Sequence, residues 1–125
     1  MSNVLLWKAY RASGAVQEFH IVHPNNAAGD QVKVADTHAD KVFGVSGRGD
    51  VASGGQVEVA HIGIADVRFG AAVVHGDLLK SSAAAGKHGR AIPATAADDR
   101  IIGVAMSNGA DGDIGQVLLG FGQVK

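Results

Sequence analysis

The chain has 125 residues, enough for one domain, and its 46% of hydrophobic residues lean on alanine while glycine contributes 18 more small side chains. Eleven basic and 12 acidic residues give a net charge of −1, which excludes the basic surplus typical of nucleic-acid-binding proteins. The absence of cysteine excludes disulfides, thiolate chemistry and cysteine-ligated metals. The low side-chain volume predicts a thin core and favours association with other chains.

The class of fold follows from the aliphatic residues, among which valine far outnumbers leucine. Branching at Cβ costs rotamer freedom in helices and suits a pleated sheet. We therefore predict an all-β fold, a compact barrel- or sandwich-like domain. The apolar run near the N-terminus is too short for a signal peptide, and nowhere does an apolar run approach the length of a membrane span. We expect a soluble protein made in cytoplasm, without a membrane partner.

Residues 1–14 combine an apolar cluster with Lys8, Arg11 and the flexible pair Ser13-Gly14. Two interpretations stay open: a first strand that covers the domain's own core, or an arm that docks on a partner by strand addition. We predict an extended arm at residues 1–14, followed by a single β domain at residues 15–125. The apolar cluster consists of Val4, Leu5, Leu6, Trp7 and Tyr10.

Alternation of apolar and polar residues predicts half-buried strands at residues 16–23 and 31–34, separated by turn residues. Between Ile62 and Phe69 the alternation slips by one near Ala65, which predicts a β-bulge or a bend between sheets. Residues 82–97 are rich in alanine and glycine, which indicates a long exposed loop with a short strand around Ala91-Ile92.

The clearest hairpin, residues 98–122, repeats an earlier stretch at residues 40–63. A turn with Gly and Asp before each unit also recurs, so we predict two quasi-repeated β units at about 29–63 and 76–122. The matches are Asp40/Asp99, Lys41/Arg100, Val42/Ile101, Phe43/Ile102, Gly44/Gly103 and Val45/Val104 at one offset, Gln56-Val57 with Gln116-Val117 after a slip, and Gly29, Asp30 and Lys33 with Gly76, Asp77 and Lys80.

Candidate ligand sites in the sequence are incomplete. Gly86-Lys87 lacks the glycine and the Ser or Thr of a phosphate-binding loop, since Ser81 and His88 stand at those positions. An i,i+3 pair of histidines, His20 and His23, points to opposite faces of a strand and does not form a metal site. Asp111-Gly112-Asp113 lacks the third oxygen ligand and the closing Glu of a calcium loop. We predict no metal and no cofactor.

Catalytic motifs are equally incomplete. The adjacent carboxylates Asp98-Asp99 are turn residues before a strand, and the tripeptide Arg48-Gly49-Asp50 on a glycine-rich tip is a chance match to an integrin-binding motif. We predict that the protein is not an enzyme and has no catalytic residue. No serine lies in a Gly-x-Ser-x-Gly motif or beside a histidine motif; the serines considered are Ser13, Ser46, Ser53, Ser81, Ser82 and Ser107.

One alternative rests on residues 39–42, whose Asp-Lys pair resembles the hairpin of lipoyl carrier domains, which are also built from two quasi-repeated β units. A carrier needs its modified lysine exposed at a hairpin tip. Lys41 instead leads directly into Val42-Phe43, and its counterpart in the repeat is Arg100. The pattern therefore argues against a carrier.

A second resemblance rests on the order of five segments: Val74–Leu79, Ala91–Ala94, Asp99–Ala105, Ala110–Asp113 and Gln116–Leu119. In this order the sequence resembles the small capsid cement or decoration proteins of tailed phages, over roughly residues 27–122. The resemblance implies a compact β-barrel-like domain on the outside of the assembled head, bound to major capsid protein, and often a homotrimer. The resemblance implies no catalytic activity.

The function we expect from this resemblance is a structural virion protein that cements major capsid protein subunits against internal DNA pressure. We predict that the apolar cluster, Val4, Leu5, Leu6, Trp7 and Tyr10, makes the capsid contact, although the resemblance does not cover these residues. A non-enzymatic module on the virion surface that attaches to a host-surface glycan is the alternative.

Overall fold

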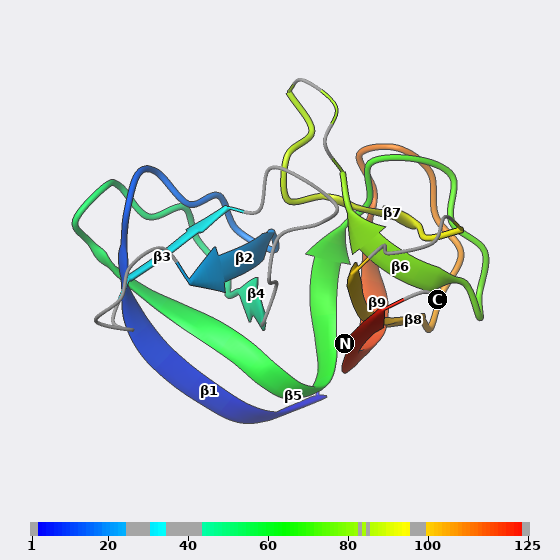
Figure 1. The fold of residues 1–125 in the computed structure, drawn as a ribbon, viewed down its shortest axis with the longest axis horizontal. Helices are drawn as coiled ribbons and strands as arrows, with labels where there is room; N and C mark the ends of the chain where they lie inside the picture. The colour runs from blue at the N-terminus through cyan, green and yellow to red at the C-terminus, as the bar shows by residue number, and fades with distance from the viewer. Residues whose placement is uncertain are drawn as a thin grey trace.

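The computed structural model describes residues 3–24, 31–34, 44–82, 84, 86–95 and 100–123. These residues form nine β-strands and no helix, so the predicted all-β class is confirmed (Figure 1). The strands are β1 (Asn3–Ala12), β2 (Ile21–Pro24), β3 (Gln31–Val34), β4 (Gly44–Ser46), β5 (Gln56–Arg68), β6 (Leu78–Ser81), β7 (Ala91–Pro93), β8 (Arg100–Ala105) and β9 (Ile114–Gln123).

The first five strands close into a ring, which we call the first barrel. β1 pairs with β3 in parallel, and β3 with β2, β2 with β4, β4 with β5 and β5 with β1 are antiparallel pairs. Because β5 returns to β1, every strand of this barrel has a neighbour on both sides over part of its length. The closure between β1 and β3 involves only Arg11 and Ala12 of β1, so it covers a short part of that edge.

The second barrel is built in the same order from β5, β7, β6, β8 and β9. Its antiparallel pairs are β7 with β6, β6 with β8, β8 with β9 and β9 with β5. The ring closes where Phe69, the residue after β5, forms a parallel bridge to Ala91 and the Gly70 amide donates to the Ala91 carbonyl at 2.9 Å. The long strand β5 therefore belongs to both barrels (Figure 1).

Several backbone hydrogen bonds of the first barrel recur at equivalent positions of the second. The Ala12 amide donates to Gly55 at 2.8 Å, and in the second barrel the Phe69 amide donates to Asp113 at 2.7 Å. Two isolated bridges correspond as well, Val16 to Val51 and Val73 to Gly109. The structural repeat therefore runs from β1 to β5 and from β5 to β9, with β5 in common, and so differs from the predicted units at about 29–63 and 76–122. Equivalent strands are β1 and β5, β2 and β6, β3 and β7, β4 and β8, and β5 and β9.

The predicted alignment of the repeats is correct at Gly44/Gly103 and Val45/Val104, which pair with equivalent residues of β2 and β6. It is wrong by two residues in the last strand. Val59 pairs with Ser46, and its structural equivalent is Val117, which pairs with Ala105. A shift of two residues preserves the alternation of faces in a strand, so the sequence pattern did not reveal it.

The proposed match between the turns before Lys33 and Lys80 is also corrected. Lys33 lies on β3 and Lys80 on β6, whereas the pairings make β3 equivalent to β7 and β2 equivalent to β6. A Gly-Asp pair precedes both segments in the sequence, and because this pair is common at turns it does not identify equivalent strands. Residues 40–43, 98 and 99 of the other matches lie outside the described residues.

The predicted bend between sheets lies in β5, which passes from one barrel to the other near Gly63 (Figure 1). Gly63 has φ of +115°, a conformation that favours glycine. The predicted slip in alternation does not occur, because Val59 and Val67 are buried while Ile62 is exposed and Ile64 half-buried. β5 has apolar residues on both faces, and in the sequence this resembles a one-residue shift in the alternation.

Each barrel has its own core. Val22, Val32, Val57 and Val59 are central to the first. Val67, Phe69, Leu79 and Ile102 are central to the second, and Ile21 of β2 and Val45 of β4 pack with this second cluster. The cores differ at one set of equivalent positions. Phe69 fills the second barrel and lies against Gly109 and Gly115, where a Cβ would meet the ring at 2.5 and 2.4 Å. The first barrel has Ala12, Val51 and Val57 at these three positions.

Candidate binding surface

The N-terminal segment lies in the sheet, as the first strand of the first barrel. β1 runs antiparallel to β5 from Asn3 to Arg11. Along it Leu5 is 73% exposed, Leu6 46% and Trp7 44%, whereas Val4 is half-buried and Tyr10 is buried. The structure therefore brings Leu5, Leu6 and Trp7 to the surface and places Tyr10 in the core.

Irregular pairing explains why three consecutive apolar residues are exposed. Val4 pairs with Gly63, Leu6 with Ile62 and Trp7 with Ala60, so the register shifts twice around Leu6. A bulge of this kind breaks the alternation of faces, and Leu6 and Trp7 both lie on the outer face. The Trp7 ring lies over Gly47, where a Cβ would stand 3.1 Å from a ring carbon, and Ala60 is buried.

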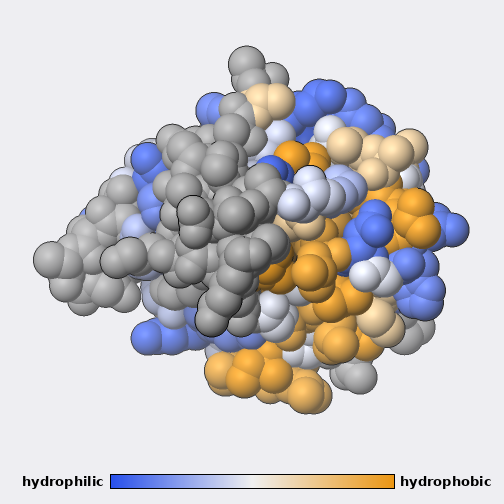
Figure 2. All heavy atoms as spheres, turned by 45° about the vertical axis from the view of Figure 1, so that its right-hand side comes forward, coloured by the Kyte–Doolittle hydropathy of each residue, from blue (hydrophilic) through white to orange (hydrophobic). Residues whose placement is uncertain are grey.

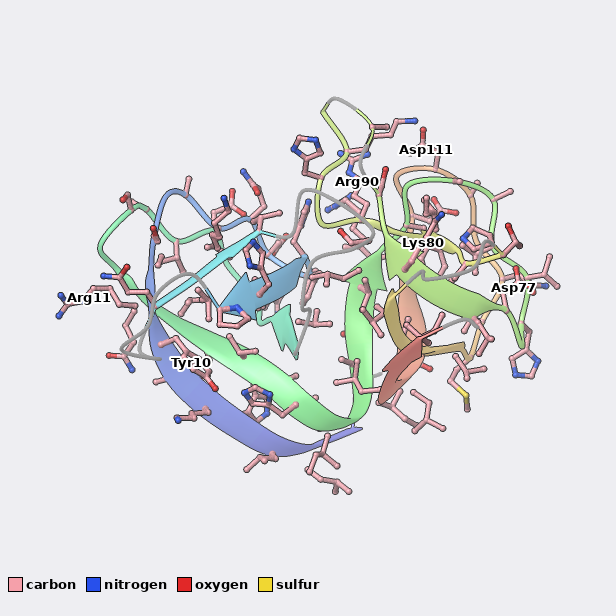
Figure 3. The ribbon with its side chains drawn as sticks, viewed as in Figure 1. Tyr10, Arg11, Asp77, Lys80, Arg90 and Asp111 are labelled. Atoms are coloured by element: carbon pink, nitrogen blue, oxygen red, sulfur yellow. The ribbon has the colours of Figure 1, made fainter. Side chains whose placement is uncertain are left out.

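Tyr10 joins β1 to β5 by its side chain (Figure 3). Its hydroxyl lies 2.9 Å from Nε2 of His61, and the two rings meet edge to face at 5.7 Å. The Lys8 ammonium lies 5.1 Å from the centre of the Tyr10 ring, within the range of a cation–π contact. Burial raises the pKa of Tyr10. Tyr10 thus fixes the strand that presents Trp7 and contributes little surface of its own.

A second apolar feature, which we call the outer row, crosses the outside of the second barrel. Leu78 pairs with Val104, Val104 with Leu118, and Leu118 with Ile64, so the four side chains share one face of four neighbouring strands. Leu78 and Leu118 are 46% and 45% exposed, and Ile62, two residues before Ile64, is 51% exposed. Hydrophobic surface extends over this side of the molecule in Figure 2.

Sequence reasoning missed the outer row. The signal was present in β5, whose residues 62 and 64 are apolar although residues 57, 59 and 67 already supply the buried face. A strand that is apolar on both faces buries one face in its own core and offers the other to a partner.

A groove of about 870 Å³ lies beside Trp7 and is lined by residues of both barrels, among them Phe19, Glu58, Asp66 and Ile114. Phe19 has φ of +59°, an uncommon conformation for a residue with a side chain. Its equivalent in the second barrel is Gly76, with φ of +98°. A bulky residue held at a position that suits glycine points to a role for its side chain at the groove.

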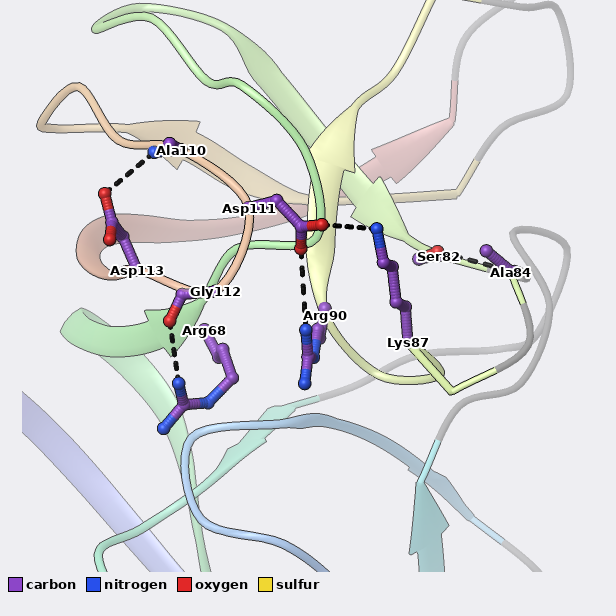
Figure 4. A network of polar contacts seen from close by, with 9 residues as sticks. All are labelled: Arg68, Ser82, Ala84, Lys87, Arg90, Ala110, Asp111, Gly112 and Asp113. Carbon is purple, nitrogen blue, oxygen red and sulfur yellow. Dashed lines mark hydrogen bonds and ion pairs between the residues drawn. The ribbon is translucent and has the colours of Figure 1, made fainter.

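The Asp111–Asp113 loop, compared above with a calcium loop, binds groups of the protein itself (Figure 4). The Asp111 carboxylate accepts from the Lys87 ammonium, and Arg90 Nη1 lies 3.5 Å from its other oxygen. The Lys87 hydrogen bond holds the pKa of Asp111 below its ordinary value. Arg68 donates to the Gly112 carbonyl at 2.7 Å. Lys87, whose pair with Gly86 was too incomplete for a phosphate-binding loop, is therefore part of a contact between two loops of the second barrel.

The two histidines that we excluded as a metal pair have local partners. His20 Nδ1 donates to the Glu18 carbonyl at 2.7 Å, and His23 Nδ1 to the Pro24 carbonyl at 2.9 Å. Within the described part of the chain no three His, Asp or Glu side chains form a cluster that could hold a metal ion. The described residues also include no helix long and apolar enough to cross a membrane.

Burial, together with the nearby positive charges of Arg90 and Arg68, lowers the pKa of His20, and the hydrogen bond to Glu18 opposes this shift. The unfolded chain then binds more protons between the lowered pKa and the ordinary value of about 6.5, so the free energy of unfolding decreases as the pH falls through this window. We expect His20→Asn to reduce that decrease in chemical unfolding measured between pH 7.5 and 5.0. The same slope in wild type and His20→Asn would contradict the assignment; His75→Gln, at an exposed histidine, is the control.

The remaining predicted sites are structural or undescribed. In the Arg48-Gly49-Asp50 loop the Gly49 amide donates to Glu18 and Asp50 accepts from the Glu18 amide, so the loop is tied to residue 18. Lys41 and Asp98-Asp99 lie outside the described residues. The exposed large apolar side chains include Leu5, Leu6 and Trp7 on β1, and Leu78 and Leu118 of the outer row.

Comparison with known proteins gives the fold a precedent. Neither a family model nor a curated protein matches the chain in sequence. Among solved structures it is similar to the head fiber gp8.5 N base of bacteriophage phi29, with a TM-score of 0.68 and 18% sequence identity over 92% of this chain and 93% of that chain. The two chains therefore share a fold along nearly their whole lengths.

Proposed function

We propose that the protein is a structural component of a phage virion that binds the outer surface of the head and cements major capsid protein subunits. The observation that carries the proposal is the fold shared with a phage head protein along nearly the whole chain. The exposed apolar surface supports it, since a protein whose task is attachment needs a surface for a partner and no reaction centre.

We assign the capsid contact to the exposed segment Leu5–Trp7, together with Val4 at its edge. Three neighbouring apolar side chains on a strand fixed by Tyr10 offer a rigid contact that loses little conformational entropy on binding. Each contact is weak by itself. Many copies that bind only the assembled shell stabilise it by mass action, because separation of subunits would release every copy.

The outer row is our candidate for contact between copies of the protein, with a homotrimer favoured. Leu78, Val104, Leu118 and Ile64 form a stretch of apolar side chains without a charged residue among them. The cores of homo-oligomeric interfaces have this composition. Sedimentation of Leu118→Glu is expected to show a smaller species than wild type.

A second candidate function, attachment to a host-surface glycan, is favoured by the groove beside Trp7. Trp7 and Phe19 line it together with Glu18, Glu58 and Asp66. Aromatic faces beside carboxylates suit a sugar, which offers C–H groups and hydroxyls together. Binding to a glycan array by the free protein would support this candidate.

Heads assembled without this protein provide the main test of the cementing function. We expect them to release DNA at a lower temperature, and after milder osmotic shock or chelation, than complete heads do. Addition of the purified protein should restore the complete heads' resistance. Equal resistance of complete and incomplete heads would overturn the proposal.

A further inference from the structure

Within the part of the chain that the structure describes, one edge of β1 is open over most of its length. β5 covers the other edge from Asn3 to Arg11, whereas β3 pairs with β1 only at Arg11 and Ala12. None of the described strands pairs with this second edge between Asn3 and Tyr10. In Figure 1 β1 forms the lower boundary of the first barrel, with β5 on its inner side. Exposed edges of this length are sites for pairing with another chain.

The hydrogen bonds at the end of β1 show which of its N–H and C=O groups face β5 and which face the open edge. The Ala12 amide donates to Gly55, on the β5 side, and the Ser13 amide donates to Val32 of β3, both at 2.8 Å. Successive residues of a strand face opposite edges, and the register is regular from Trp7 onward. Trp7 and Ala9 therefore direct their N–H and C=O groups to the open edge.

The repeat shows what fits such an edge. β5 plays in the second barrel the part that β1 plays in the first, and Ile64 of β5 pairs with Leu118 on one side and Asn3 on the other. The edge of β5 that is equivalent to the open edge of β1 is therefore not open. It is covered by β1, which pairs with it in antiparallel orientation. The fold accepts an added antiparallel strand at this position once, in the second barrel.

We infer that a strand of the major capsid protein adds antiparallel to the open edge of β1 when the protein binds the head; this inference rests on the proposed function. Charge favours a different chain over a second copy. β1 carries Lys8 and Arg11 and no acidic residue, so two β1 strands side by side would gather cations without a carboxylate. The fitting partner is an extended segment in which Asp or Glu alternates with apolar residues, the latter against Leu6 and Trp7 on the outer face.

The experiment compares Ala9→Pro with Ala9→Thr. Proline removes the amide that faces the open edge and leaves the β5 ladder intact, since that amide has no partner in β5. Threonine keeps the amide and suits a strand. Ala9 is exposed, so neither change creates a cavity. Each variant is mixed with heads assembled without the protein, binding is measured by co-sedimentation, and folding is checked by thermal unfolding.

We expect Ala9→Pro to bind heads about tenfold more weakly than Ala9→Thr. Hydrogen exchange of the wild type, followed by mass spectrometry, should slow at residues 4–10 on bound heads, a readout that needs no variant. Equal binding of both variants with unchanged exchange at residues 4–10, while the wild type binds, would overturn strand addition and leave the proposed function standing. A wild-type protein that does not bind heads would overturn the function and this inference together.

Discussion

Replacement of Phe69 with alanine is expected to lower the free energy of unfolding by about 3–5 kcal/mol. The ring is fully buried in the second barrel, where it fills the space left by Gly109 and Gly115. Two glycines offer no side chain that could close the resulting cavity. A loss of this size is a large part of the stability of a small domain, about 5–15 kcal/mol in general, and chemical denaturation measures it directly.

The equivalent positions of the first barrel suggest substitutions that compensate for Phe69→Ala. The first barrel holds Ala12 where the second holds Phe69, and it holds Val51 and Val57 where the second holds Gly109 and Gly115. The two barrels thus keep a similar core volume: the second combines one large side chain with two glycines, and the first combines a small side chain with two valines. We expect Gly109→Val and Gly115→Val, added to Phe69→Ala, to recover part of the lost stability, because neither glycine has a positive φ.

Controls separate packing from other effects. Met106→Ala, at an exposed apolar residue, should change the free energy of unfolding by less than about 0.5 kcal/mol. The two valines introduced without Phe69→Ala should destabilise the protein, since their Cβ atoms would overlap the ring. If the triple variant were less stable than Phe69→Ala alone, the claim that the cores compensate volume would fail.

The sequence predicted the all-β class and the duplication because both leave a local trace. The high valine content indicates the all-β class. Strands β4 and β8 keep the same Gly-Val pair because a Cβ at Gly103 would overlap the Leu118 carbonyl oxygen, and a Cβ at Gly44 would overlap Val59. Such steric demands act at single positions and survive in the sequence.

The order of the strands in the sheet could not be predicted from the sequence. β3 pairs with β1 in parallel and β2 lies between β3 and β4, an arrangement that depends on contacts between residues distant in the chain. The period of two in strands also hid the register of β9, since shifts by an even number preserve the faces. Of the residues predicted for the capsid contact, Leu5–Trp7 are exposed, whereas Tyr10 is buried because alternation places it opposite Val57 on the core side. The contact itself stays a prediction.

Replacement of Trp7 with alanine is expected to weaken binding to heads by about 2–4 kcal/mol, a loss of roughly 30- to 1,000-fold in affinity. Trp7 offers the largest apolar side chain on the exposed part of β1, and its position over Gly47 fixes the ring before binding. A large side chain that is already ordered loses little entropy in an interface, and residues of this kind dominate binding energies. Titration of heads assembled without the protein gives the affinity.

Tyr10→Phe is the matched control for Trp7→Ala. It removes the hydroxyl that contacts His61, so we expect a loss of about 1 kcal/mol in the free energy of unfolding and an unchanged affinity for heads. Leu78→Ala, on the second barrel, tests whether any loss of exposed apolar surface weakens the contact. If Trp7→Ala bound heads as tightly as wild type while Leu78→Ala did not, the contact would lie on the outer row, and the assignment to β1 would be wrong.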